Sequence, residues 1–288
     1  MMENTMQQAG AASRGLSGTA LKLVALVCMV LDHIHYFFAF TGAVPVWFSM
    51  AGRLAAPLFT FCLAEGFAHT HSRRRYFLRV AAVAVPMGAL RFFMQYGGVL
   101  VRPDGFYPAN AVFTDFLVFM LLWQALDWLR TPGRRALGGL LASGVLAWPL
   151  ASAWVVLRFF PGAETALGLA WYTVLPAWTA GEGGLPYLLG ALAMYAFRRR
   201  RAIQLAAWGA VTFLYWVVYL GTVLAGQGMP LTVLFTDAFE WMQLFAIPLL
   251  LLYNGQRGRG LKGLFYTFYP AHVYILYALS WLVYSRLF

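Results

Sequence analysis

Residues 19–40 read TALKLVALVCMVLDHIHYFFAF, a run in which apolar side chains dominate for more than twenty positions. Such a run decides the fold, because 18 or more apolar residues in an α-helix, at 1.5 Å per residue, cross about 30 Å of hydrocarbon. The run is also too long for the core of a signal peptide. We therefore expect it to be a retained transmembrane helix.

The rest of the chain repeats this pattern. Of the 288 residues, 61% are hydrophobic and 11% are charged, whereas soluble domains carry about 25% charged residues. The sequence predicts an all-α polytopic membrane protein of about nine transmembrane helices. The stretch 166–178 is short and contains Pro176, so we expect it to be interfacial or re-entrant, while a tenth span stays possible. The nine predicted spans are 19–40, 47–69, 75–96, 110–130, 136–157, 184–197, 203–224, 231–252 and 264–285.

Basic residues indicate the orientation. Most of the 21 Lys and Arg residues cluster near the N-terminus and at 73–79, 130–135, 198–201 and 257–262, in alternate loops between the predicted spans. By the positive-inside rule these loops are cytoplasmic, which places the N-terminus in the cytoplasm and the C-terminus outside. We expect residues 1–18 to form a disordered cytoplasmic segment and residues 19–288 a single transmembrane domain. The short, separated clusters account for the net charge of +11 without a nucleic-acid partner.

Ionisable residues within the spans are candidates for function, because an ionised side chain at the bilayer centre costs about 2.5–3.5 kcal/mol. Asp32, His33 and Arg53 are predicted at one depth in the outer half of the membrane. An outer polar cavity is the simplest way to hydrate or pair them. The other ionisable residues predicted in that half are Arg91, Asp115, Asp237 and Glu240.

Two histidines are the strongest candidates for chemistry. A carboxylate that holds a histidine is a general-base arrangement, so we expect Asp32 to orient His33, although Asp32 and Arg53 could instead form only a structural ion pair. His272 follows Pro270 in the last span, where a kinked helix with a histidine is costly to insert. The sequence lacks a phosphate-binding loop, a Gly-x-Ser-x-Gly motif and a His-Glu-x-x-His motif, so we expect no metal.

Motifs at both ends of the chain resemble the TraX family. They are Leu31-Asp32-His33-Ile34, Gly52-Arg53-Leu54-Ala55-Ala56-Pro57-Leu58-Phe59, Ala64-Glu65-Gly66-Phe67 with His69-Thr70, Leu252-Tyr253-Asn254-Gly255, and Phe268-Tyr269-Pro270-Ala271-His272. The resemblance covers nearly all of residues 19–285, strongly at the two ends and more loosely from about 130 to 230. Lys22 and His33 also stand eleven positions apart, as a basic residue and a histidine do in one branch of the wider transmembrane acyltransferases.

The resemblance implies an acetyltransferase embedded in the bacterial inner membrane. The donor would be cytoplasmic acetyl-CoA, and the acceptor an amine or hydroxyl of a peptide such as pilin, of a glycan or of a lipid. His33 would act as general base or carry the acetyl group. Asp32 would orient His33, Arg53 would stabilise the oxyanion, and His272 would also belong to the catalytic residues. The residues expected at the donor site are Lys22, Glu65, His69, Arg73, Arg74, Arg75, Asn254, Arg257, Lys262 and Tyr269.

Two other classes of function fit the buried charges less well. A proton-coupled transporter or lipid flippase would use the Asp, His and Arg side chains to bind protons or a polar solute. Such proteins often contain inverted repeats, and none is visible in this sequence. A non-catalytic membrane scaffold or assembly partner would need none of these charges. In each case we expect membrane lipids to be partners of the protein.

Overall fold

The computed structural model describes residues 15–288, apart from the side chains of Thr165, Leu169 and Lys262. In that part the chain is built from helices, and Leu16 and Tyr253 form an isolated β-bridge. The first helices along the chain are α2 (Gly18–Phe38), α3 (Trp47–Gly52), α4 (Ala55–Ala68), α5 (Arg73–Gly97), α6 (Val112–Leu129), α7 (Arg135–Phe159) and α8 (Glu164–Val174). They are followed by α9 (Gly184–Ala196), α10 (Arg201–Phe213), α11 (Leu220–Gly226), α12 (Val233–Thr236), α13 (Ala246–Leu251) and α14 (Lys262–Leu287).

Within residues 15–288, six helical segments are long and apolar enough to cross a membrane. They are Gly18–Thr41, Trp47–Ala68, Arg73–Gly97, Val112–Leu129, Arg135–Phe159 and Arg201–Gly226. The predicted helical class is thus confirmed, while the count of nine spans and the orientation stay predictions. The stretch expected to be interfacial or re-entrant overlaps α8, whose 11 residues are too few to cross about 30 Å.

The predicted span 231–252 is not one continuous helix, which corrects the sequence-based expectation. It consists of α12, a 3₁₀ segment (Phe239–Phe245) and α13. The break falls at Asp237 and Ala238. Apolar composition alone predicted one helix here. In the structure, Glu240 in the 3₁₀ segment lies beside Arg53 at the end of α3, and the two side chains form an ion pair at 3.5 Å.

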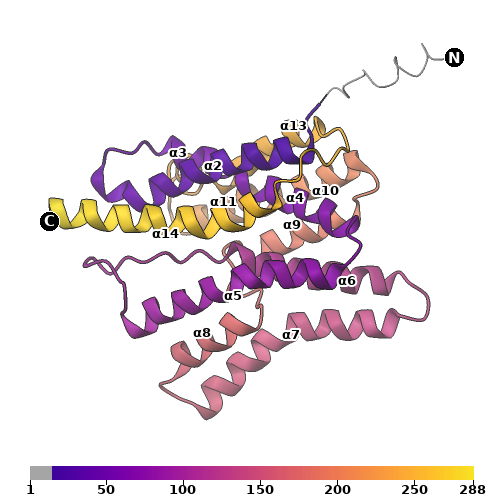
Figure 1. Ribbon diagram of the computed structural model, residues 1–288, viewed down its shortest axis with the longest axis horizontal. Helices are drawn as coiled ribbons and strands as arrows, with labels where there is room; N and C mark the ends of the chain where they lie inside the picture. Colours follow the sequence, from indigo (N-terminus) through magenta and orange to yellow (C-terminus); the bar gives the residue numbers. More distant parts are fainter. Residues whose placement is uncertain (1–14) are drawn as a thin grey trace.

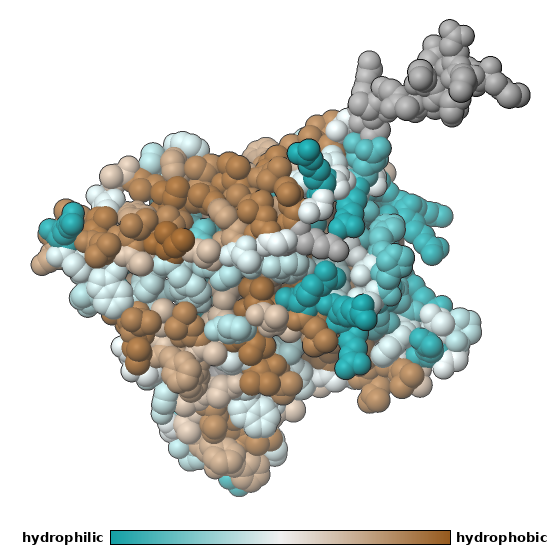
Figure 2. Space-filling view, in the orientation of Figure 1, coloured by the Kyte–Doolittle hydropathy of each residue, from teal (hydrophilic) through white to brown (hydrophobic). Residues whose placement is uncertain are grey.

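Helix α14 lies between α2 and α5 in the ribbon diagram (Figure 1), and it contacts both of them. The last helix of the chain therefore packs beside α2. Helices α7 and α8 lie at the opposite edge, where α8 packs on α5 and α7 packs on α6. Figure 2 shows hydrophilic residues gathered at the end near residue 15, while brown, apolar residues cover much of the remaining face. That division is expected of a bundle with an apolar solvent around its middle.

The residues that precede α2 are bound to the loop that precedes α14. Leu16 N–H donates to the Leu252 carbonyl at 2.7 Å, and Asn254 N–H donates to the Leu16 carbonyl at 3.0 Å. The Thr19 hydroxyl lies 2.6 Å from the Arg259 carbonyl. Of the predicted disordered segment 1–18, residues 1–14 lie outside the described residues, and residues 15–18 belong to this paired structure.

Candidate active site

A cavity of about 740 Å³ runs through the bundle between α2, α4, α5 and α14. One group of lining side chains is basic and lies near the start of α2: Lys22, His69, His71, Arg79 and Arg257. The other group lies about eleven residues further along α2 and is mixed in charge: Asp32, His33, Arg53, Asn110, Glu182 and Glu240. Eleven residues of helix span roughly 16 Å, so the cavity has a cationic end and a more acidic end.

His33 and His272 form a hydrogen-bonded pair at the second group. Nδ1 of His33 lies 2.8 Å from Nε2 of His272. The other nitrogen of His33 lies 2.9 Å from the Asn110 amide nitrogen, and Nδ1 of His272 lies 2.9 Å from the Phe268 carbonyl oxygen. Both side chains are buried, with 6% and 7% of their surface exposed. His33 lines the cavity, and His272 supports it from α14.

Asp32 does not orient His33, which corrects the expected catalytic arrangement. Its carboxylate accepts hydrogen bonds from Arg53 Nη2 and from the Ser49 hydroxyl, both at 2.7 Å. Consecutive residues on a helix do not face each other, so Asp32 and His33 point to different neighbours. The expectation that Asp32 and Arg53 share a depth is met, and their ion pair joins α2 to the end of α3.

Gly52 makes this ion pair possible. A Cβ atom at residue 52 would lie 2.3 Å from the Cβ of Asp32, a distance at which one of the two backbones must move. The absence of a side chain therefore lets α3 approach α2 closely enough for Arg53 to reach the carboxylate. Arg53 also contacts Glu240, so its positive charge lies between two carboxylates.

Glu182 is a cavity residue that the sequence argument did not place. Its carboxylate accepts hydrogen bonds from the N–H groups of Ala111 and of Val112 (2.9 Å), at the start of α6. Anions are favoured there, because the first N–H groups of a helix lack partners within it. The Glu182 N–H in turn donates to Asp115 at 2.9 Å. Glu182 lies in the glycine-rich run Gly181-Glu182-Gly183-Gly184, which has no helical period from which its direction could be read.

Three residues expected in the polar cavity lie elsewhere. Asp115 is buried and contacts the backbone of Glu182 instead of lining the cavity. Asp237 is exposed and accepts a hydrogen bond from the hydroxyl of Thr236 at 2.6 Å. Both were placed by depth alone, and depth does not say which side of a helix a residue occupies. Arg91 lines a smaller neighbouring cavity.

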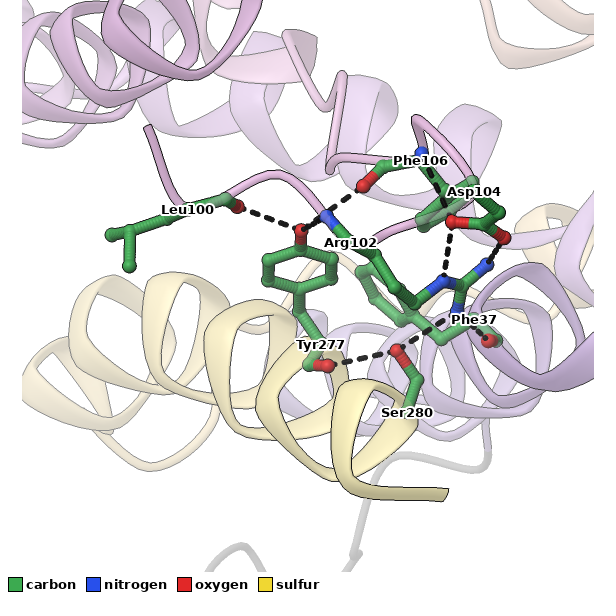
Figure 3. A network of polar contacts seen from close by, with 7 residues as sticks. All are labelled: Phe37, Leu100, Arg102, Asp104, Phe106, Tyr277 and Ser280. Carbon is green, nitrogen blue, oxygen red and sulfur yellow. Dashed lines mark hydrogen bonds and ion pairs between the residues drawn. The ribbon is translucent and has the colours of Figure 1, made fainter. Parts of the chain in front are cut away.

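The loop 98–111 delivers Asn110 to His33, and Arg102 anchors that loop (Figure 3). Its guanidinium forms two hydrogen bonds with Asp104, at 2.9 and 2.7 Å. It also donates to the Phe37 carbonyl on α2 at 3.3 Å and to the Ser280 hydroxyl on α14 at 3.2 Å. Arg102 is 3% exposed. One side chain thus connects the loop of Asn110 with the helices of His33 and His272.

The pKa of Asp104 lies below its ordinary value because the Arg102 guanidinium donates hydrogen bonds to the carboxylate. Tyr277 completes the anchor, since its hydroxyl accepts from the Arg102 N–H at 3.0 Å and lies 2.8 Å from the Leu100 carbonyl oxygen. Leu100 has a φ of 56°, a conformation that is unfavourable for a residue with a side chain. The tyrosine contact holds the loop in that conformation.

The residues expected at the donor site divide into two groups. Lys22, His69, Arg257 and Tyr269 line the cavity. The cavity is also lined by His71 and Arg79, which were not expected at the donor site. The basic patches in the sequence pointed to this end of the bundle but could not separate the lining residues from their neighbours.

The remaining expected donor residues do not line the cavity. Arg73 instead donates to Asp127 at 2.7 Å, and Arg198 donates to the same carboxylate at 3.0 Å. Arg74 and Arg75 are exposed. Glu65 faces Arg201 at 3.9 Å. The other two are Asn254, which lies in the loop paired with Leu16, and Lys262, which begins α14 and whose side chain is outside the described part.

Comparison with known proteins gives one match to a family and one to a relative. A family model described as "TraX protein" matches residues 17–280. A "Probable fimbrial assembly protein FimC, serogroup H1" of Dichelobacter nodosus is 33% identical over 103 residues, which cover 29% of this chain and 41% of the relative. The chain therefore spans less than half the length of that relative. No solved structure matches the chain.

Proposed function

Since the chain belongs to the TraX family, we propose that it is a membrane-embedded acetyltransferase that transfers an acetyl group from acetyl-CoA to an amine or hydroxyl. The observation that carries the proposal is the His33–His272 pair, buried at the wall of a cavity whose other end is cationic. A histidine that is within reach of a reacting group can remove its proton, and such general-base catalysis contributes about 10²–10⁴-fold to a rate.

The cationic end supports the donor half of the proposal. Lys22, Arg79 and Arg257 carry three positive charges toward one opening of the cavity. Phosphate groups favour such surroundings, because hydrogen bonds from Arg or Lys to phosphate are stronger than those between neutral groups. The narrow acyl-carrying arm of the donor would then extend along α2 toward His33. With the basic loops cytoplasmic, this end would face the cytoplasm of a bacterium and the protein would lie in its inner membrane.

The reaction needs one base and no oxidant. The lone pair of the acceptor attacks the thioester carbonyl carbon, while Nε2 of His33 takes the proton of the acceptor. The carbon–sulfur bond then breaks, and the departing thiolate recovers that proton from His33. His272 supports the positive charge on His33 by accepting the Nδ1–H hydrogen bond. Arg53, held near the site by Asp32 and Glu240, supplies a positive charge toward the oxygen of the tetrahedral intermediate.

The acceptor that we propose to test first is a fimbrial or pilus subunit, because the relative from Dichelobacter nodosus is named a fimbrial assembly protein. A short peptide with a free α-amino group and one with a blocked α-amino group form a matched pair of candidates. Transfer to the free peptide alone would identify an amine acceptor, whereas transfer to neither would direct the search to glycans and lipids.

The decisive experiment incubates the purified protein, in detergent or nanodiscs, with radiolabelled acetyl-CoA. Thioester cleavage and label on protein or acceptor are followed for the unchanged protein, His33→Ala and His35→Ala. His35 lies on the same helix and is not among the cavity-lining residues, so it is a matched control. We expect loss of transfer in His33→Ala only. Full transfer by His33→Ala would exclude this histidine as the base.

Proton-coupled transport is the second candidate, favoured by the Glu182 carboxylate, which lines the cavity, and by the buried Asp115 that contacts the Glu182 backbone. Carboxylates in such positions serve as proton relays in transporters. Proteoliposomes with an imposed pH gradient test it directly. Proton flux that is abolished in Glu182→Gln, together with no cleavage of acetyl-CoA, would establish transport instead of transfer.

A further inference from the structure

The hydrogen-bond partners of the histidine pair determine which nitrogen of each ring carries the proton. The Phe268 carbonyl oxygen can only accept, so Nδ1 of His272 carries its proton. In a neutral His272 ring, Nε2 then has a lone pair and accepts from His33, so Nδ1 of His33 is also protonated. The remaining nitrogen of a neutral His33, Nε2, must have the lone pair.

Asn110 must therefore point its NH₂ group toward His33. Its nitrogen lies 2.9 Å from Nε2 of His33, and a lone pair there requires a donor. The amide oxygen of Asn110 then points away from the histidines. That oxygen is buried and has no hydrogen-bond partner among the described residues.

A second polar atom that is unpartnered among the described residues lies beside the same small cavity and belongs to Arg91. Its Nε–H is also buried and without a partner among residues 15–288. Both side chains line the same small cavity, with a volume of about 10 Å³, next to the main one. A single water needs about 10–15 Å³ and two or more polar partners. The cavity reaches the lower limit of that volume, and a single water in it would accept from the Arg91 Nε–H and donate to the Asn110 oxygen.

We propose that Arg91 and Asn110 are positioning residues that, through one bound water, hold the pair in the form with the His33 Nε2 lone pair available to the main cavity. Arginine has donors and no acceptor. If Asn110 were rotated, its NH₂ group would face the arginine and its oxygen would face the lone pair of His33. The chain of hydrogen bonds has the Phe268 carbonyl at one end and Arg91 at the other. Each end favours the same placement of protons on the two histidines and the same orientation of the Asn110 amide.

The consequence for the reaction rests on the proposed function. Asn110 and His33 both line the main cavity, so an acceptor N–H or O–H reaches Nε2 by taking the place of the Asn110 NH₂ group. The amide marks the position of the acceptor proton and is replaced by it. The histidine then needs no change of tautomer before it acts as a base.

The first test is spectroscopic and does not require activity. The protein contains five histidines, and ¹⁵N labelling of histidine with solid-state NMR in bilayers at pH 8 distinguishes protonated from unprotonated ring nitrogens. His33→Ala assigns the His33 signals by their disappearance. We expect a protonated Nδ1 and an unprotonated Nε2 for His33. A protonated Nε2 in the unchanged protein would overturn the proposal.

Asn110→Asp is the decisive variant, because it has nearly the same shape and a carboxylate can only accept. We expect Nε2 of His33 to become protonated and kcat for acetyl transfer to fall about 10²-fold or more, since the base lone pair is then occupied. Arg91→Met is the second variant. In it we expect a resolvable fraction of Nε2-protonated His33 and about a tenfold lower kcat with unchanged KM, partly restored in Arg91→Lys.

Arg158→Met is the matched control, because it removes the same group from an exposed position at the end of α7. Histidine signals in both Asn110→Asp and Arg91→Met that equal those of the control would refute the inference. If the signals change as expected but the unchanged protein transfers no acetyl group, the positioning role stands and the proposed function falls. If transfer occurs but Asn110→Asp leaves it unaltered, the reverse holds.

Discussion

His33 on α2 and His272 on α14 are separated by 239 residues in the chain, yet Nδ1 of the first lies 2.8 Å from Nε2 of the second. This contact joins the two parts of the sequence that carry the clearest motifs. It also gives His272 a role besides packing, which is to accept a hydrogen bond from Nδ1 of His33 with its Nε2 atom.

Replacement of His272 by Leu should lower kcat for acetyl transfer by about 10- to 100-fold, because a buried N–H without a partner is unfavourable by about 1–3 kcal/mol. His272→Gln places an amide oxygen that can accept from His33, and it should retain a larger part of the rate. Initial rates with saturating acetyl-CoA measure both variants. Equal losses in the two would mean that the ring fills space without accepting a hydrogen bond.

Arg257 and Arg74 separate the residues that line the cavity from those that do not. Arg257→Gln should raise the dissociation constant of acetyl-CoA about tenfold, equivalent to about 1.4 kcal/mol, because Arg257 lines the cationic end. Arg74→Gln removes the same charge from an exposed position and should leave it within twofold. Isothermal titration in detergent gives both constants, and similar effects of the two variants would show that only net charge matters.

Asp104 makes the anchor of loop 98–111 sensitive to acid. Its pKa is lower in the folded protein than in the unfolded chain, where it is about 3.9. The stabilisation from its pair with Arg102 is therefore present above about pH 4 and is lost as the pH falls through the folded pKa. Thermal unfolding of the unchanged protein and of Asp104→Asn should differ at pH 6, and the difference should shrink as the pH is lowered below about 4. A constant difference across that range would assign the effect to another group.

Gly52 sets the distance between α2 and α3. Gly52→Ala should destabilise the protein by about 1–3 kcal/mol, as is typical of an added methyl group in a packed interior, because the new Cβ would lie 2.3 Å from that of Asp32. A Cβ at Gly139 on α7 would meet nothing within 4 Å. Gly139→Ala should therefore be neutral or stabilising by up to about 1 kcal/mol. Thermal unfolding in one detergent compares the two, and equal stability would show that α3 moves freely.

The sequence predicted the helices well because length and apolar composition are local properties. Most predicted spans correspond to helix in the structure, including α14, whose start and end lie within a few residues of 264 and 285, although 47–69 is divided into α3 and α4. The failure at 231–252 involves a contact that is distant in the sequence, which local composition does not contain. Polar Asp237 and Glu240 stand within four positions of each other, and the pairing of Glu240 with Arg53 favours a tighter turn there than hydropathy indicates.

The sequence predicted which residues belong to the candidate site better than it predicted the contacts between them. Depth brought Asp32, Arg53 and Glu240 together correctly, since rise along a helix is regular. Depth does not give rotation about the helix axis, and for that reason Asp32 was expected to face His33. Asn110 and Glu182 lie in or beside loops whose paths depend on Arg102 and on the start of α6, and these are long-range contacts that no local pattern contains.

The pairing of α2 with α14 affects when this protein can first become active. Chains are synthesised at roughly 5–20 residues per second, so about 12–48 s pass between the addition of residue 33 and that of residue 272. Until then His33 has no partner from α14, and residues 15–19 have no loop to pair with. The wall of the cavity closes only when the last helix is in place, so on the proposed function a nascent chain already inserted in the membrane stays inert.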